Sequence, residues 1–100
     1  MKQLLLLLLA INLYADDALS CLSLAIYHEA RGSSLADQAA VADVILNRVN
    51  SDRYPDTVCG VVKQGRYWRG NPVRDKCHFS FWCDGKSDRM TDVVAAKSAY

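Results

Sequence analysis

Glu29 is the residue of this sequence best suited to acid–base chemistry. It is the only glutamate in the chain, and the other ten acidic residues are aspartates. It follows Ile26 by three residues and Leu22 by seven, so on a helix it would lie close to the apolar stripe that these residues form. Apolar surroundings disfavour a charged carboxyl and raise its pKa. Such a carboxyl can act as a general acid that protonates a leaving-group oxygen.

Two other interpretations of these residues stay open. Glu29 can pair with Arg31 or Arg48, or simply face water, and composition and spacing alone favour this reading. A less favoured alternative is nucleophilic chemistry by Cys21 with His28, which follows seven residues later.

The four cysteines predict two disulfides. An even cysteine count in a small exported chain is typical of an oxidising compartment. Three pairings are possible, and we favour Cys77–Cys83 as a local link and Cys21–Cys59 as a long one. Each would add roughly 2–4 kcal/mol of stability. A zinc site is disfavoured because no CxxC or HxxxH spacing occurs, so we expect neither a metal nor another cofactor.

The first fifteen residues have the features of a secretory signal peptide. Lys2 precedes the apolar run Leu4–Leu9, and Ala15 is a small residue at which cleavage would leave Asp16–Tyr100 as the mature domain. The apolar run is shorter than the ~20 residues that span a bilayer. Without Lys2, eleven basic residues face eleven acidic ones, which disfavours nucleic acid as a partner. We expect a monomer that is secreted or periplasmic, with no stable membrane span.

The periodicity of the mature chain predicts a small, mostly α domain with an irregular region of loop or short strands. The most strongly predicted helix is capped by Ser34 and is apolar enough for us to expect it at the centre of the core. Gly32 supplies a stop for the helix before it, and Asp56 or Thr57 caps the next one. We expect helices at residues 19–30, 34–49, 57–62 and 90–100, a loop or irregular strand pair at residues 64–76, and an aromatic-rich segment between Cys77 and Cys83. The last helix runs to the end of the chain without a stop signal, which predicts a truncated domain.

Four ordered blocks of this sequence resemble the bacterial cell-wall hydrolase family that includes the spore-cortex lytic enzymes. The resemblance extends from about Leu22 to Ala96. The family usually has glycine where His28 stands and often an acid where Ser33 stands, and the stretch Gly65–Lys76 does not match closely. The blocks are Leu24–Gly32 (LAIYHEARG), Gln38–Val49 (QAAVADVILNRV), Tyr54–Val62 (YPDTVCGVV), and Phe79-Ser80-Phe81 with Asp84-Gly85.

This resemblance implies a lysozyme-like helical domain that acts on the glycan strands of peptidoglycan. It also implies that Glu29 occupies the position of the family's catalytic glutamate. Such enzymes are typically lytic transglycosylases, in which one carboxyl protonates the glycosidic oxygen and then takes a proton from the 6-hydroxyl of the sugar. The product is a 1,6-anhydro sugar, so a second carboxylate is not needed, whereas ordinary glycoside hydrolysis uses two.

Several polar and aromatic side chains are candidates for holding the sugar. On an extended segment, Ser80 would face away from its neighbours Phe79 and Phe81. An indole offers a flat apolar face to a sugar ring, and we assign that role to Trp68 and a core position to Trp82. The other candidates for substrate binding are Tyr27 and Gln38, with Asn47, for which we favour a structural role in capping or pairing at the end of its helix.

Two non-enzymatic functions remain as alternatives. The first is a peptidoglycan-binding module that has the fold without the activity. The second is a disulfide-linked secreted effector that uses the loop Gly65–Lys76 as its contact surface. The segment Lys63–Lys76 holds five cations against one acid, Asp75, and can either meet carboxylates of peptide stems or teichoic polymers or be a solvated face; we favour the solvated face.

Overall fold

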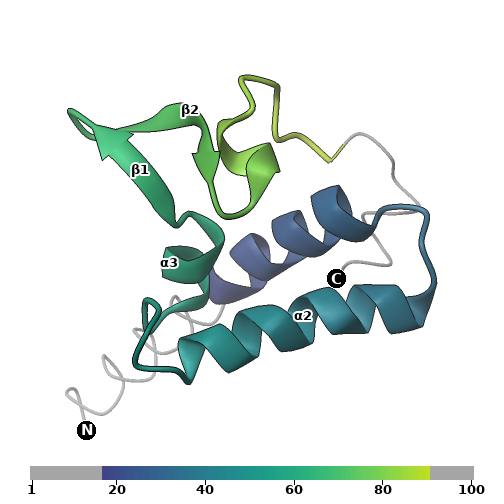
Figure 1. Cartoon of the computed structure of the whole chain (residues 1–100). Helices are drawn as coiled ribbons and strands as arrows, with labels where there is room; N and C mark the ends of the chain where they lie inside the picture. The colour runs from purple at the N-terminus through teal and green to yellow at the C-terminus, as the bar shows by residue number, and fades with distance from the viewer. Residues whose placement is uncertain (1–16, 91–100) are drawn as a thin grey trace, which may run out of the picture.

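The computed structural model describes residues 17–90 of the 100-residue chain. The predicted signal peptide and the predicted helix beyond Met90 lie outside the described residues. Among the described residues, no helix is long and apolar enough to cross a membrane. Helices dominate the described fold, as predicted, and a two-stranded sheet accompanies them (Figure 1).

The first helix is described from residue 17 to residue 30. It ends as predicted, because Gly32 adopts a φ of 79°, in the left-handed region that glycine reaches without a steric penalty. The backbone N–H of Ser33 then donates to the carbonyl of Ala30 at 3.0 Å, which satisfies one of the last carbonyls of the helix. This helix supplies Cys21 and Ala25 to the core.

Helix α2 (Leu35–Val49) begins where the sequence predicts, because the Ser34 hydroxyl accepts a hydrogen bond from the Asp37 N–H at 3.2 Å. It runs opposite in direction to the first helix (Figure 1). The expectation that α2 lies at the centre of the core is wrong for the described fold. Only Ile45 is buried, while Leu35 is 75% exposed and Leu46 is 43% exposed. The reason is that the described neighbours pack against one flank of α2, through Ile45, Val41 and Ala42.

Helix α3 (Val58–Val62) is capped by Thr57, one of the two residues predicted for this role, because its hydroxyl accepts from the Gly60 N–H at 2.9 Å. Val61 and Val62 are fully buried and join the core. A short helix of this kind has little stability of its own, so its burial holds it in place.

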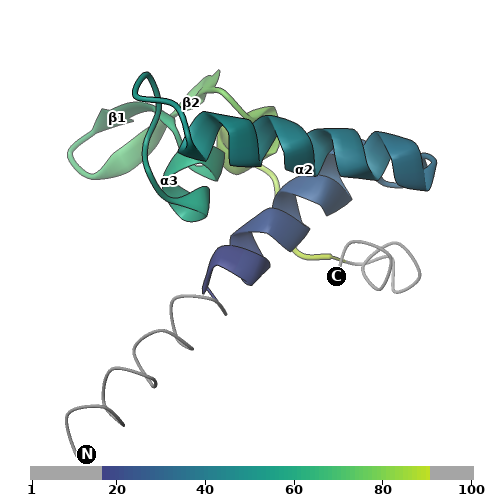
Figure 2. The same ribbon diagram turned by 90° about the horizontal axis from the view of Figure 1, so that it is seen from below.

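The region expected to be a loop or a short strand pair is a β-hairpin. Strands β1 (Gly65–Trp68) and β2 (Asn71–Cys77) are antiparallel, with Trp68 opposite Asn71 and Gly65 opposite Cys77. Both central residues of the turn have positive φ, 51° at Arg69 and 80° at Gly70. Such turns match the right-handed twist of the strands. The hairpin extends away from α3 at one end of the molecule (Figures 1 and 2).

Gly65 is required by the close approach of the two strands. A Cβ at this position would lie 2.7 Å from the Lys76 carbonyl oxygen and 2.8 Å from the Cys77 Cα, both of which are backbone atoms that cannot turn aside. We therefore expect Gly65→Ala to lower the free energy of unfolding by about 2 kcal/mol, measured by urea denaturation. Gly70→Ala is the comparison, because nothing lies within 4 Å of its Cβ position and only its positive φ opposes the change. A smaller loss in G65A than in G70A would contradict this prediction.

The 3₁₀ helix η1 (Ser80–Cys83) follows the hairpin and returns the chain to the core. Phe79 and Phe81 are buried and Ser80 is exposed, which is the alternation predicted for these three residues, although Ser80 begins a 3₁₀ turn instead of continuing an extended segment. The residues of this core are Cys21, Ala25, Ile45, Val61, Val62, Phe79 and Phe81.

Both disulfides of the favoured pairing are present in the structure. Cys21–Cys59 joins the first helix to α3 across 38 residues, with 5.3 Å between the Cα atoms. Cys77–Cys83 joins β2 to η1 across six residues, with 6.1 Å between the Cα atoms. The Cys21–Cys59 disulfide therefore connects two elements of the core. The Cys77–Cys83 disulfide connects the base of the hairpin to η1.

Candidate functional site

Glu29 lies in the last turn of the first helix, two residues before Arg31 and three before the turn at Gly32. Its side chain is exposed, so the apolar surroundings expected for its carboxyl are not present in the described structure. The physical reason is the side of the helix on which it lies. Tyr27 and Ala30, in the same turn, are buried, whereas Glu29 lies on the side that faces away from the core, beside the exposed loop that leads to α2. An exposed carboxyl at this place is accessible to a large ligand.

His28, the neighbour of Glu29 in the sequence, binds a segment of the chain that lies 60 residues further on. Its Nε2 lies 2.9 Å from the carbonyl oxygen of Asp88, and because a carbonyl only accepts, Nε2 carries the proton and donates it. The imidazole also stacks on Phe81, with 4.7 Å between ring centroids and 10° between planes. Met90 packs against Ile26 and Tyr27 on the same helix. Residues 88–90 therefore pack against Tyr27 and His28, in the turn of the helix that contains Glu29.

The pKa of the Asp88 carboxyl is raised above its ordinary value. Burial raises the pKa of its carboxyl, the nearby His28 opposes this rise, and Asp84 adds to it. A pKa that is raised on folding means that the folded state binds the proton more tightly than the unfolded state. Stability is therefore gained as pH falls through the raised pKa, and the ionised Asp88 opposes folding at neutral pH.

Asp88→Asn should remove this dependence while leaving in place the backbone carbonyl that His28 binds. We expect a small increase in melting temperature at pH 7, and a difference between variant and wild type that shrinks as pH falls towards the ordinary aspartate pKa. Thermal unfolding followed by circular dichroism at a series of pH values measures it. A difference that stays constant with pH would contradict the assignment.

Tyr27 does not fit the predicted role in substrate binding. Its side chain is 2% exposed, which leaves no ring face open to a sugar. Arg31 donates from Nη1 to the Tyr27 hydroxyl at 3.1 Å, and its guanidinium carbon lies 5.4 Å from the ring centroid. Tyr27 is therefore a packing residue whose hydroxyl and ring contact Arg31.

Gln38 does lie near the turn that follows Glu29. It is half-buried on α2, and its Nε2 donates to the Ser33 carbonyl at 3.3 Å. This contact fixes the loop between the first helix and α2. Gln38 therefore contacts the loop that follows Glu29 through the backbone of Ser33.

The remaining candidates are more dispersed. Ser80 is exposed and adjoins Phe81, the residue that stacks on His28. Trp68 is 69% exposed, but the turn of the hairpin that it adjoins and the end of the first helix lie at opposite ends of the described fold (Figures 1 and 2). Asn47 is exposed near the end of α2. The structure thus places residues 88–90 against the last turns of the first helix and Gln38 against the loop that follows it, and leaves Trp68 apart.

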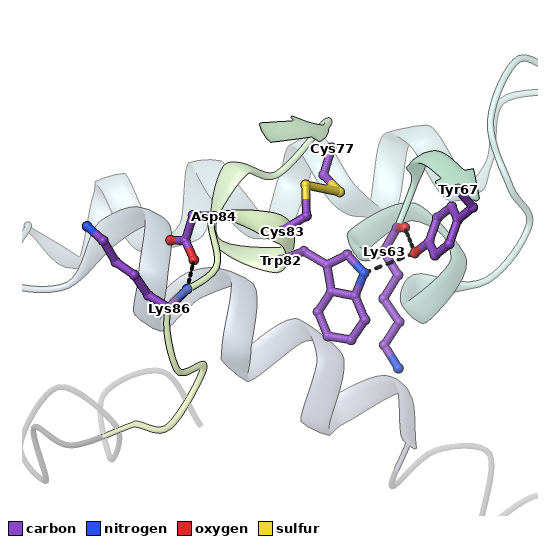
Figure 3. The surroundings of a disulfide bond; sticks show 7 residues. All are labelled: Lys63, Tyr67, Cys77, Trp82, Cys83, Asp84 and Lys86. Carbon is purple, nitrogen blue, oxygen red and sulfur yellow. Dashed lines mark hydrogen bonds between the residues drawn. A yellow bond between two sulfur atoms is a disulfide. The ribbon is translucent and has the colours of Figure 1, made fainter. Parts of the chain in front are cut away.

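Trp82 is half-buried and packs against the core, close to the position predicted for it. Its Nε1 donates to the Tyr67 hydroxyl at 2.9 Å, and that hydroxyl donates to the Lys63 carbonyl (Figure 3). This chain of hydrogen bonds connects η1 to the hairpin and to the end of α3. Within residues 17–90, no group of three or more His, Cys, Asp or Glu side chains is arranged to hold a metal ion.

The partnership of His28 with Asp88 was not found from the sequence. The two residues are 60 positions apart, and no local pattern connects them. The only available signal was that histidine stands where the resembled family usually has glycine. That signal marked His28 as unusual without indicating what it binds.

Comparison with known proteins identifies the family of this chain. The sequence profile of the cell wall hydrolases matches residues 32–100, so the match begins three residues after Glu29. The spore cortex-lytic enzyme of Halalkalibacterium halodurans is 49% identical over 49 residues, which are 49% of this chain and 15% of that protein. The spore cortex-lytic enzyme of Oceanobacillus iheyensis is 47% identical over 53 residues, 53% of this chain and 19% of that protein.

A third relative, the spore cortex-lytic enzyme of Bacillus subtilis strain 168, is 43% identical over 49 residues, 49% of this chain and 16% of that protein. The aligned segment thus covers less than a fifth of the length of each of these three relatives. No solved structure matches the chain significantly. Because the profile match covers more than half of the sequence, the chain belongs to the cell wall hydrolase family.

Proposed function

We propose that this protein is an exported enzyme that cleaves the glycan strand of peptidoglycan, with Glu29 as its general acid. The single observation that carries the proposal is the position of Glu29. The only glutamate of a cell wall hydrolase lies exposed at the end of a helix, where a polymer can reach it. The names of the relatives, which describe lysis of spore cortex, support the same substrate class.

The proposed reaction is lytic transglycosylation with one carboxyl group. The Glu29 carboxyl donates its proton to the glycosidic oxygen as the bond from that oxygen to the anomeric carbon breaks. The carboxylate then accepts the proton of the 6-hydroxyl of the same sugar, whose oxygen bonds to the anomeric carbon. This closes a 1,6-anhydro ring and returns the proton to Glu29, so no water is consumed and no second carboxylate takes part.

Export is part of the proposal. The signal-like segment Met1–Ala15 and the two disulfides support a location outside the cytoplasm, in the cell envelope or the medium. A domain of this size buries a modest share of its surface, so covalent links contribute a substantial part of its stability.

Mass analysis of the muropeptides released from purified sacculi tests the reaction. Products with 1,6-anhydro ends would support transglycosylation. Products with free reducing ends would replace it by hydrolysis, in which water takes the place of the 6-hydroxyl. Release of nothing would overturn the enzymatic proposal and favour the peptidoglycan-binding module.

A further inference from the structure

Positive charge is concentrated in the hairpin and the two residues that precede it. Residues 17–90 contain ten lysine and arginine residues and nine aspartate and glutamate residues. Five of these ten cations lie between residues 63 and 76, together with one of the nine acids, Asp75. The segment therefore carries a charge of +4, and the rest of the described chain carries −3. Such a separation creates a local potential that a balanced net charge conceals.

The charged and aromatic side chains of the hairpin are exposed. Trp68 is 69% exposed and Tyr67 is 43% exposed. The guanidinium carbon of Arg69 lies 5.6 Å from the centroid of the Trp68 ring, so a cation and a flat apolar face are presented together. The exposed cations of the hairpin and its turn are Arg66, Arg69, Arg74 and Lys76.

The base of the hairpin is held in several ways. The Cys77–Cys83 disulfide ties β2 to η1, and the Trp82 indole donates to the Tyr67 hydroxyl, which in turn bonds to the Lys63 carbonyl (Figure 3). A surface that is already ordered loses little conformational entropy when it binds a ligand. The exposed side chains are thus carried on a fixed support.

We propose that this hairpin is a second binding site, for the carboxylate-bearing strands of peptidoglycan, remote from Glu29. The proposal rests on the proposed function for the identity of the polymer. The indole face suits the apolar face of a sugar ring, and the planar guanidinium groups suit carboxylates, which they bind in a bidentate manner. A glycan strand whose peptide stems carry carboxylates offers both partners.

The same surface argues against a membrane and against nucleic acid. Trp68 is the only large apolar side chain that the hairpin exposes without a polar bond, because the Tyr67 hydroxyl is engaged with Trp82 and Lys63. One indole gives little area for burial in lipid. Nucleic acid binding depends mainly on neutralising many phosphates, and the acids outside the hairpin oppose that.

Sedimentation with insoluble sacculi measures this binding directly. The probe is peptidoglycan stripped of phosphodiester polymers, and all variants carry Glu29→Gln so that the strands stay intact. We expect the Glu29→Gln protein, which is the parent of the other variants, to bind with an affinity that falls as the sodium chloride concentration is raised. Arg66→Gln with Arg69→Gln should weaken binding about tenfold. Trp68→Ala should weaken it by a similar factor.

Arg53→Gln with Lys86→Gln is the matched control, since it removes two exposed cations outside the hairpin. The Lys86 side chain points away from Trp82 and Tyr67 (Figure 3). Equal losses in the two double variants would overturn the proposal, as would failure of the parent to bind. Binding to unstripped walls only, or equally to phosphatidylglycerol vesicles or single-stranded DNA, would assign the hairpin to another polyanion. The sedimentation experiment measures binding and not cleavage. Its result therefore stands even if the muropeptide assay shows that the protein does not cleave sacculi.

Discussion

Replacing Glu29 with glutamine should reduce the release of muropeptides from sacculi by about 10²- to 10⁴-fold, the range that a positioned general acid contributes. Glutamine keeps the size and polarity of the side chain but cannot donate the proton to the glycosidic oxygen. Since Glu29 is exposed, the variant should fold as the wild type does, with an unchanged melting temperature. The rate of appearance of soluble products, measured by mass spectrometry, gives the effect.

Asp43→Asn is the control for this experiment, because it neutralises an exposed carboxyl on α2 instead of on the first helix. It should retain wild-type activity. If E29Q were as active as D43N, the general acid would have to be another group, and the proposed mechanism would be wrong.

Loss of the Cys21–Cys59 disulfide should be the largest single change in stability. The chain-entropy model relates the stabilisation to the logarithm of the loop length, so closing 38 residues contributes about 4 kcal/mol and closing six contributes about 2 kcal/mol. We expect Cys21→Ala with Cys59→Ala to lower the free energy of unfolding by about twice as much as Cys77→Ala with Cys83→Ala. Alanine is used because Cys21 is buried, and a hydroxyl there would need a partner.

Urea denaturation of the two double variants and the wild type compares these losses. Equal losses would mean that local packing, and not loop closure, sets the contribution of each link. The fluorescence of Trp82, which precedes Cys83 in η1, provides a second check. The Cys77–Cys83 variant should also change the fluorescence of the nearby Trp82, whereas the Cys21–Cys59 variant should leave that signal in the folded state unchanged.

The parts of this fold that the sequence predicted correctly depend on local interactions. The Ser34 and Thr57 caps and the glycine stop at Gly32 act within a few residues, so residue type and spacing are enough to locate them. The turn at Arg69-Gly70 was less visible because its first position lacks the asparagine or aspartate that usually signals a turn with two positive φ angles.

The parts that were missed depend on contacts between distant segments. The apolar pattern of α2 shows which residues avoid water, but it does not show how many neighbours cover them, and Leu35 and Leu46 are exposed. The exposure of Glu29 depends on which side of the helix packs against the core, and the bond from His28 to Asp88 depends on the path of a segment 60 residues away. Helical periodicity contains neither kind of information.

The hairpin has a fixed base and a turn that takes no part in the core. Gly65 and Cys77 are constrained by backbone contact and by the disulfide, whereas a Cβ at Gly70 would meet no atom within 4 Å. Amino-acid changes near the turn that respect its φ angles should therefore be nearly neutral for folding. Changes at this turn can therefore alter what the hairpin binds without disturbing the scaffold that carries the acid.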